Sequence, residues 1–243
     1  TGLTSSWIQS FAICQGKLFA GSGEEGIFKS GDTGTTWTQI TNGPESENIL
    51  SMTSDDDNVY AGTDDSGIFM TNDLGVTWQK LGNDLDDKMI LSMAIAGTNI
   101  LAGTYGNGMY LSSDDGTTWE QVVNGIPDDL RINSIVTHDT MTIAGCGDGK
   151  IRISYNNGDS WYQLGDDLPG MSVLSVWAEE DYIYAGLNAG GVWRCPTDII
   201  TGYDIKTLDP DISISPNPAT TIVKIDPGFS KGVVLTVMNP SGS

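Results

Sequence analysis

Short apolar runs alternate with turns of glycine, aspartate and asparagine along most of the chain. The stretch ILSMTSDDDNVYAGTDDSGIFMTNDLGVTWQKL, residues 49–81, holds four such runs rich in β-branched and aromatic residues. Residues of this kind favour strands, and the polar residues between them favour tight turns. The stretch therefore predicts a sheet of four antiparallel strands in which consecutive strands are neighbours. We find no apolar residues at helical spacing in the sequence.

The pattern occurs five times, each time around an Ala-Gly pair. The aligned segments read LFAGSGEEGIFKS, VYAGTDDSGIFMT, ILAGTYGNGMYLS, TIAGCGDGKIRIS and IYAGLNAGGVWRC. Ten residues before each alanine stands a serine: Ser10, Ser51, Ser92, Ser134 and Ser175. A small sheet cannot cover both of its faces alone, so repeated sheets must pack together, and four strands every 41 or 42 residues is typical of a β-propeller.

The sequence thus predicts an all-β fold, a β-propeller of four-stranded antiparallel blades with five repeats visible between residue 7 and about 200. Five inner strands would either close a small ring alone or form part of a larger ring. The last repeat has no convincing fourth strand.

Four repeats contain a polar octet that ends in tryptophan: SGDTGTTW, TNDLGVTW, SSDDGTTW and SYNNGDSW. The acid or amide at the third place is expected to accept hydrogen bonds from its own turn, and the later glycine to adopt a positive φ. The tryptophan is expected to pack between neighbouring sheets. The defined positions are Ser30, Asp32, Gly34, Thr36, Trp37, Thr71, Asp73, Gly75, Thr77, Trp78, Ser112, Asp114, Gly116, Thr118, Trp119, Ser154, Asn156, Gly158, Ser160 and Trp161.

The pattern S/T-x-D-x-G-x-T-W resembles the Asp box, or BNR repeat, of sialidases, sortilin-type receptors, the photosystem assembly propeller and some xyloglucanases. Three octets match at every defined place, and the fourth has Asn156 for Asp and Ser160 for Thr. In those families the box is a structural turn on the blade periphery, away from the face that binds substrate. The resemblance implies a propeller fold and a structural role for the octets.

The period stops after Cys195. Residues 213–225, SISPNPATTIVKI, resemble the start of the C-terminal sorting domain of type IX secretion cargo, with the core motif at Pro216, Asn217, Pro218, Ala219 and Thr221. The resemblance implies contact with the type IX secretion machinery and an extracellular or outer cell surface location. We predict a propeller at 1–200, a linker at 201–211 and a partial, β-sandwich-like sorting domain at 212–243. The alternative is a short β appendage that covers the last blade.

Charge narrows the choice of partners. The chain has 32 acidic and 11 basic residues, a formal net charge of -21, which would repel a nucleic-acid backbone or an anionic membrane surface. No apolar run approaches the roughly 20 residues of a transmembrane helix. The three cysteines are far apart in the sequence and form no CxxC motif, so neither a zinc site nor a disulfide scaffold is indicated. We predict no nucleic-acid partner and no transmembrane segment.

In a propeller, the loop from second to third strand and the loop from fourth to next first strand open on one face, where ligands usually sit. Candidate ligand-face residues in these loops are Glu24, Glu25, Asp64, Asp65, Tyr105 and Asp148. The acids are interpreted as solvated loop residues. The alternatives are a carboxylate pair for glycoside hydrolysis or a weak Ca²⁺ site.

Sialidases bind the substrate carboxylate with three convergent arginines, and this chain has only Arg131, Arg152 and Arg194. These fall at the start of a first strand and within two third strands, so we expect no convergence and no sialidase activity. We predict no catalytic residue, no cofactor and no metal site. The leading interpretation is a secreted or cell-surface module that binds carbohydrate or protein. The alternatives are a polysaccharide-degrading glycoside hydrolase that uses two loop carboxylates, and a structural subunit of a surface assembly.

Overall fold

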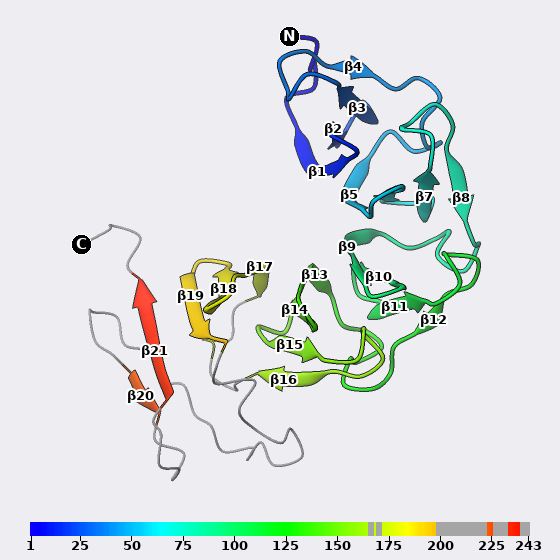
Figure 1. The fold of residues 1–243 in the computed structure, drawn as a ribbon. Helices are drawn as coiled ribbons and strands as arrows, with labels where there is room; N and C mark the ends of the chain where they lie inside the picture. Colours follow the sequence, from blue (N-terminus) through cyan, green and yellow to red (C-terminus); the bar gives the residue numbers. More distant parts are fainter. Residues whose placement is uncertain (165–167, 169–171, 198–222, 226–232, 239–243) are drawn as a thin grey trace.

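The computed structural model describes residues 1–164, 168, 172–197, 223–225 and 233–238. Within these residues every regular element is a β-strand, and the strands form five antiparallel sheets. The sheets follow one another around an arc (Figure 1). The predicted all-β propeller of four-stranded blades is confirmed by this arrangement.

Each sheet is a meander in which neighbouring strands are consecutive in the chain. The first sheet contains β1 (Ile8–Cys14), β2 (Lys17–Ser22), β3 (Ile27–Ser30) and β4 (Thr38–Gln39). The second contains β5 (Ile49–Ser54), β6 (Val59–Thr63), β7 (Ile68–Thr71) and β8 (Gln79–Leu81). The third contains β9 (Ile90–Ala96), β10 (Asn99–Thr104), β11 (Met109–Ser112) and β12 (Glu120–Gln121). The fourth contains β13 (Ile132–His138), β14 (Met141–Cys146), β15 (Ile151–Ser154) and β16 (Tyr162–Leu164).

The fifth sheet begins with β17 (Val173–Ala178), β18 (Tyr182–Leu187) and β19 (Gly191–Pro196). Its fourth strand comes from the tail, because β21 (Val233–Met238) pairs antiparallel with β19, and β20 (Val223–Ile225) pairs with β21. Part of the segment 212–243 is thus attached to the last sheet. The predicted linker 201–211 and the motif residues Pro216, Asn217, Pro218, Ala219 and Thr221 lie outside the described residues.

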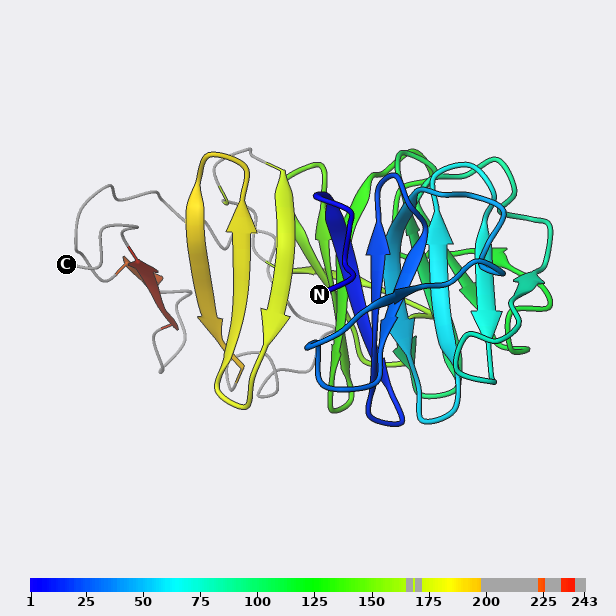
Figure 2. The same ribbon diagram turned by 90° about the horizontal axis from the view of Figure 1, so that it is seen from above.

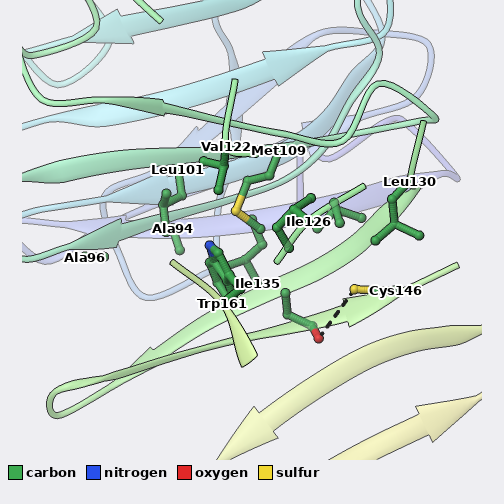
Figure 3. Close-up of a cluster of buried hydrophobic side chains, with 12 residues drawn as sticks. Ala94, Ala96, Leu101, Met109, Val122, Ile126, Leu130, Ile135, Cys146 and Trp161 are labelled. Atoms are coloured by element: carbon green, nitrogen blue, oxygen red, sulfur yellow. Dashed lines mark hydrogen bonds between the residues drawn. The ribbon is translucent and has the colours of Figure 1, made fainter. Parts of the chain in front are cut away.

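The core lies between the sheets. The inner strands β1, β5, β9, β13 and β17 are successive neighbours, and the strands run between two faces that carry the connecting loops (Figure 2). Figure 3 shows the cluster between the third and fourth sheets, where Trp161 lies among Leu101, Met109 and Ile135. Trp161 is only 4% exposed. The tryptophan of the fourth octet therefore packs between sheets, as the sequence predicts.

The glycine of each of the first four Ala-Gly pairs makes close sheet packing possible. A Cβ added at Gly21, Gly62 or Gly103 would lie 2.6 Å from the isoleucine that opens the next inner strand, Ile49, Ile90 or Ile132. At Gly145 it would lie 2.7 Å from Val173. The repeat requires glycine here because the next sheet occupies the space of a side chain.

Candidate functional site

The octets form one recurring turn. In the first, Ser30 Oγ accepts a hydrogen bond from the amide of Gly34 at 2.9 Å and donates to Asp32 Oδ1 at 2.8 Å. Asp32 also accepts from the amide of Thr36 at 2.8 Å and from Thr36 Oγ1 at 2.6 Å. The indole of Trp37 donates to the carbonyl of Gly34 at 3.0 Å. Both oxygens of the Asp32 carboxylate are therefore engaged within the turn.

The second and third octets repeat these bonds through Asp73 and Asp114. Hydrogen bonds from Thr36 and Ser30 lower the pKa of Asp32 to about 2, and those from Thr77 and Thr71 lower the pKa of Asp73 to about 2. Such carboxylates stay ionised as hydrogen-bond acceptors. They are poorly suited to act as a general acid near neutral pH.

The fourth octet keeps the turn without a carboxylate. Asn156 Oδ1 accepts from the amide of Ser160 at 3.1 Å, and Asn156 Nδ2 donates to Ser160 Oγ at 3.0 Å. Gly158 has a φ of 94°, and the amide of Gly158 donates to Ser154 Oγ at 2.9 Å. The octets are thus turn-forming units whose polar groups bond to each other.

The predicted ligand-face loops do lie together at one end of the sheets. The amide of Gly26 donates to the carbonyl of Glu47 at 2.8 Å, and the amide of Gly108 donates to the carbonyl of Leu130 at 2.9 Å. Each bond joins a loop between second and third strands to the loop that enters the next sheet. The shared face predicted from the strand order is therefore present.

The six candidate residues of these loops have different environments. Glu24 is exposed, Glu25 accepts from Thr4 Oγ1 at 2.6 Å, and Asp65 accepts from Ser66 Oγ at 2.9 Å. The carboxylate of Asp64 accepts from Ser46 and Asn48 at 3.0 and 2.8 Å. Asp148 and Tyr105 contact arginines, which are described below.

Five β-bulges direct side chains toward the propeller axis. The register of every inner strand shifts one residue before the repeat serine. A bulge changes the direction of the extra side chain. The bulged residues are Gln9, Leu50, Leu91, Asn133 and Leu174. With Trp7 and Arg131 they line a pocket of about 270 Å³, here called the axial pocket.

The axial pocket combines aromatic and amide groups. Trp7 and Tyr105 are each 55% exposed, and the guanidinium of Arg131 lies 4.5 Å from the centre of the Tyr105 ring. Gln9 Nε2 donates to Asn48 Oδ1 at 2.8 Å, and Asn133 Nδ2 donates to the carbonyl of Val173 at 2.7 Å. Tyr105 is thus the predicted ligand-face residue that lies beside this pocket.

Two polar atoms of the axial pocket are buried without a hydrogen-bond partner among the described residues, Arg131 Nε and Asn133 Oδ1. Buried polar groups normally have partners, because an unpaired group costs about 1–3 kcal/mol. Both residues line the axial pocket, but these two atoms are themselves buried. No carboxylate lines this pocket.

Sequence reasoning overlooked most of the axial pocket. The sequence did contain one signal, at the position directly before the repeat serine. Three repeats have leucine there, Leu50, Leu91 and Leu174, whereas the other two have Gln9 and Asn133. A polar residue at an otherwise apolar repeat position indicates a local function. The bulge that points these side chains to the axis could not be read from single residues.

A second hollow, of about 790 Å³, lies beside the fourth sheet, and its lining includes Asp128, Trp161 and Arg152. Buried Arg152 donates to both oxygens of Asp148 at 3.1 and 2.7 Å and to the carbonyl of Gly125 at 3.0 Å. Arg152 replaces the aromatic residue at the same repeat position in the other sheets: Phe28, Phe69, Tyr110 and Trp193. The ion pair is accordingly part of the blade structure.

The three arginines lie in three different places. Arg131 is at the axial pocket, Arg152 is in the fourth sheet, and Arg194 stacks on Tyr182 in the fifth sheet at 4.6 Å. Among the described residues, no group of three or more histidines, cysteines, aspartates or glutamates is placed to hold a metal ion. The described part of the chain also contains no helix long and apolar enough to cross a membrane.

Repeated four-stranded sheets arranged around an axial pocket define a β-propeller protein. Residues 9–142 match the DUF6242 beta propeller domain, and the chain belongs to this family. The comparison with curated proteins gave no match.

Solved structures share the fold at low sequence identity. The extracellular domain of a one-component system from B. thetaiotaomicron is 15% identical with a TM-score of 0.65, over 82% of this chain and 30% of that one. The GH74 xyloglucanase from Xanthomonas campestris is 12% identical with a TM-score of 0.64, over 76% and 36% of the two chains. YCF48 from Cyanidioschyzon merolae is 16% identical with a TM-score of 0.54, over 76% and 67%. The first two structures are thus much longer than this chain.

Proposed function

We propose that the chain is a non-catalytic binding module that holds a carbohydrate in the axial pocket. The observation that carries the proposal is that exposed Trp7 and the amides of Gln9 and Asn133 line one pocket, with exposed Tyr105 beside it against Arg131. Aromatic rings offer flat apolar surface, and amides offer both donors and acceptors. A sugar ring presents the matching combination of C–H faces and hydroxyl groups.

The size of the axial pocket favours one sugar unit or the end of a chain. Its volume of about 270 Å³ lies just below the roughly 300–1,000 Å³ of pockets that enclose drug-sized ligands. The polar side chains in the lining, Gln9, Arg131 and Asn133, would offer hydrogen bonds to hydroxyl groups. The absence of a carboxylate from the lining makes hydrolysis the weaker alternative, because glycoside hydrolysis usually needs two.

An extracellular or outer cell surface location belongs to the same proposal. It is supported by the sorting-domain resemblance of residues 213–225 and by the likeness to an extracellular domain. Carbohydrate polymers are abundant ligands at cell surfaces, and the negative charge of the chain suits neutral glycans better than acidic ones.

A glycan array with the full chain tests the proposal, and sugars released from the same wells report hydrolysis. Trp7→Ala and Asn133→Leu should each weaken binding by roughly tenfold or more, as expected for the loss of an aromatic contact or of a hydrogen bond. Tyr162→Ala is the matched control, since Tyr162 is an exposed aromatic on an outer strand away from the pocket. Full binding by both pocket variants would refute the axial site, and released sugar would favour the hydrolase.

A further inference from the structure

Consecutive sheets are joined by one interface that recurs four times. The residue that opens each inner strand packs on the repeat glycine of the preceding sheet, as Ile49 does on Gly21. At three of the four interfaces the repeat serine bonds to the following sheet: Ser51 Oγ donates to the carbonyl of Ile90 at 2.9 Å, Ser92 Oγ donates to the carbonyl of Ile132 at 3.2 Å, and Ser134 Oγ accepts from the amide of Val176 at 3.2 Å. Ser10 Oγ is buried without a hydrogen-bond partner among the described residues. One side of each sheet thus carries the apolar residue that opens the inner strand, and the other side carries the repeat glycine and serine.

Within the part of the chain that the structure describes, no sheet covers the side of the first sheet that carries Ile8 and Phe11. Phe11 is 58% exposed, whereas the residues at its repeat position, Met52, Met93, Ile135 and Val176, are 6 to 9% exposed. Ile8 is only partly buried, although its counterpart Ile49 is fully buried. Phe11 contacts Trp37 with ring centres 6.4 Å apart, and Ile13 is exposed on the same strand. These four residues, Ile8, Phe11, Ile13 and Trp37, are called the head face.

No described residue of another sheet covers the complementary side of the fifth sheet. At Gly186 an added Cβ would meet only atoms of Ser175 in the same sheet, whereas the other four repeat glycines meet the residue that opens the next inner strand. Ser175 is exposed, in contrast to buried Ser51 and Ser92. Trp177 is 59% exposed and Val192 is also exposed. These residues, Ser175, Trp177, Gly186 and Val192, are called the tail face.

The two faces therefore match as the internal interfaces do: the head face carries the opening apolar residue, and the tail face carries the repeat glycine and serine. They differ in size, because Trp177 stands where the first and third sheets have the small residues Ala12 and Ala94. Phe11 likewise stands where the other sheets have methionine, isoleucine or valine. Larger aromatic anchors are typical of surfaces that associate without a covalent link.

We propose that the head face of one copy binds the tail face of a second copy. Ile8 of one copy would pack over Gly186 of the other, and the Ser175 hydroxyl would donate to the carbonyl of Ile8, as Ser51 does to Ile90 and Ser92 to Ile132. Such a contact is heterologous, so each copy keeps one free head face or tail face for further association. Because both copies carry a net charge of -21, association should strengthen as salt is added.

Sedimentation equilibrium of the full chain over a range of concentrations tests the proposal. The wild type should assemble, and Phe11→Glu or Trp177→Glu should each abolish self-association, because each variant places a charge in the apolar contact. An equimolar mixture of the two variants should form a dimer, since one variant retains the tail face and the other retains the head face. Val76→Glu is the matched control, because Val76 is exposed on an octet turn and should leave association unchanged.

Circular dichroism and thermal melting establish that the variants fold, which is expected because both substituted side chains are exposed. A wild type that stays monomeric up to its solubility limit would overturn the proposal. So would single variants that assemble like the wild type, or a mixture that stays monomeric. Glycan binding by the monomeric variants is measured separately, so this result is independent of the axial pocket.

Discussion

Replacing Trp161 with alanine tests how far the octet tryptophan stabilises the contact between sheets. The side chain is 4% exposed and packs among residues of the third and fourth sheets, and its Nε1 donates to the carbonyl of Gly158 at 2.9 Å. An indole buries roughly 150–250 Å², which at about 25 cal/mol/Å² corresponds to roughly 4–6 kcal/mol as an upper bound. Measured Trp-to-Ala costs of about 3–5 kcal/mol in protein cores agree with this size. We expect Trp161→Ala to lower the free energy of unfolding by about 4 kcal/mol.

Trp37→Ala is the internal comparison, because Trp37 has the same octet position and the same indole hydrogen bond but is only partly buried, with no preceding sheet among the described residues. We expect a loss of about 1–2 kcal/mol, in proportion to its smaller burial. Urea unfolding followed by far-ultraviolet circular dichroism measures both variants, at concentrations where the chain is monomeric. Equal losses for Trp37→Ala and Trp161→Ala, or a loss below about 1 kcal/mol for Trp161→Ala, would refute the reasoning.

Three further predictions concern the blades themselves. Gly103→Ala should lower the melting temperature more than Gly186→Ala, because only at Gly103 would the new Cβ meet an isoleucine of the next sheet, at 2.6 Å; equal shifts would contradict the role of the glycine in sheet packing. Arg152→Met should cost about 3 kcal/mol in urea unfolding by leaving the Asp148 carboxylate without its guanidinium, and Arg152→Phe with Asp148→Ser should recover much of the loss; a double variant as unstable as the single one would show that the arginine itself is needed. The folded pKa of Asp73 is lowered to about 2, so its carboxylate stabilises the fold above pH 4 and the stabilisation is lost as the pH falls toward 2; the melting temperatures of wild type and Asp73→Asn should therefore converge over this range, and a constant difference would exclude the charge as the cause.

The sheets were predictable because the same pattern of apolar runs and polar turns occurs five times in the sequence. One segment such as GIFMT is too short to assign alone, but five copies at one spacing leave only a stacked β architecture. The octet turn was predictable for a local reason, because Asp73 and Thr77 are four residues apart and bond within one turn. The pairing of β21 with β19 depends on contacts distant in sequence, and no local pattern encodes it.

The axial pocket was less predictable than the octets. Tyr105 was identified from its loop, but Gln9 and Asn133 face the axis only because each inner strand carries a bulge. A bulge depends on how two strands pair, which residue types alone do not determine. Asp148 was assigned to the ligand face by its position, yet the structure turns its carboxylate to Arg152.

The bulges also separate two tasks within each inner strand. A bulged residue such as Leu91 is unmatched in the pairing register, while its neighbours Ile90 and Ser92 carry the packing and the hydrogen bond that join the sheets. Substitution of a bulged leucine therefore changes the wall of the pocket without removing a hydrogen bond between sheets, whereas Gln9 and Asn133 also bond to Asn48 and Val173 at the next sheet. The three leucine positions, Leu50, Leu91 and Leu174, can therefore be varied to sample different ligand specificities on one unchanged scaffold.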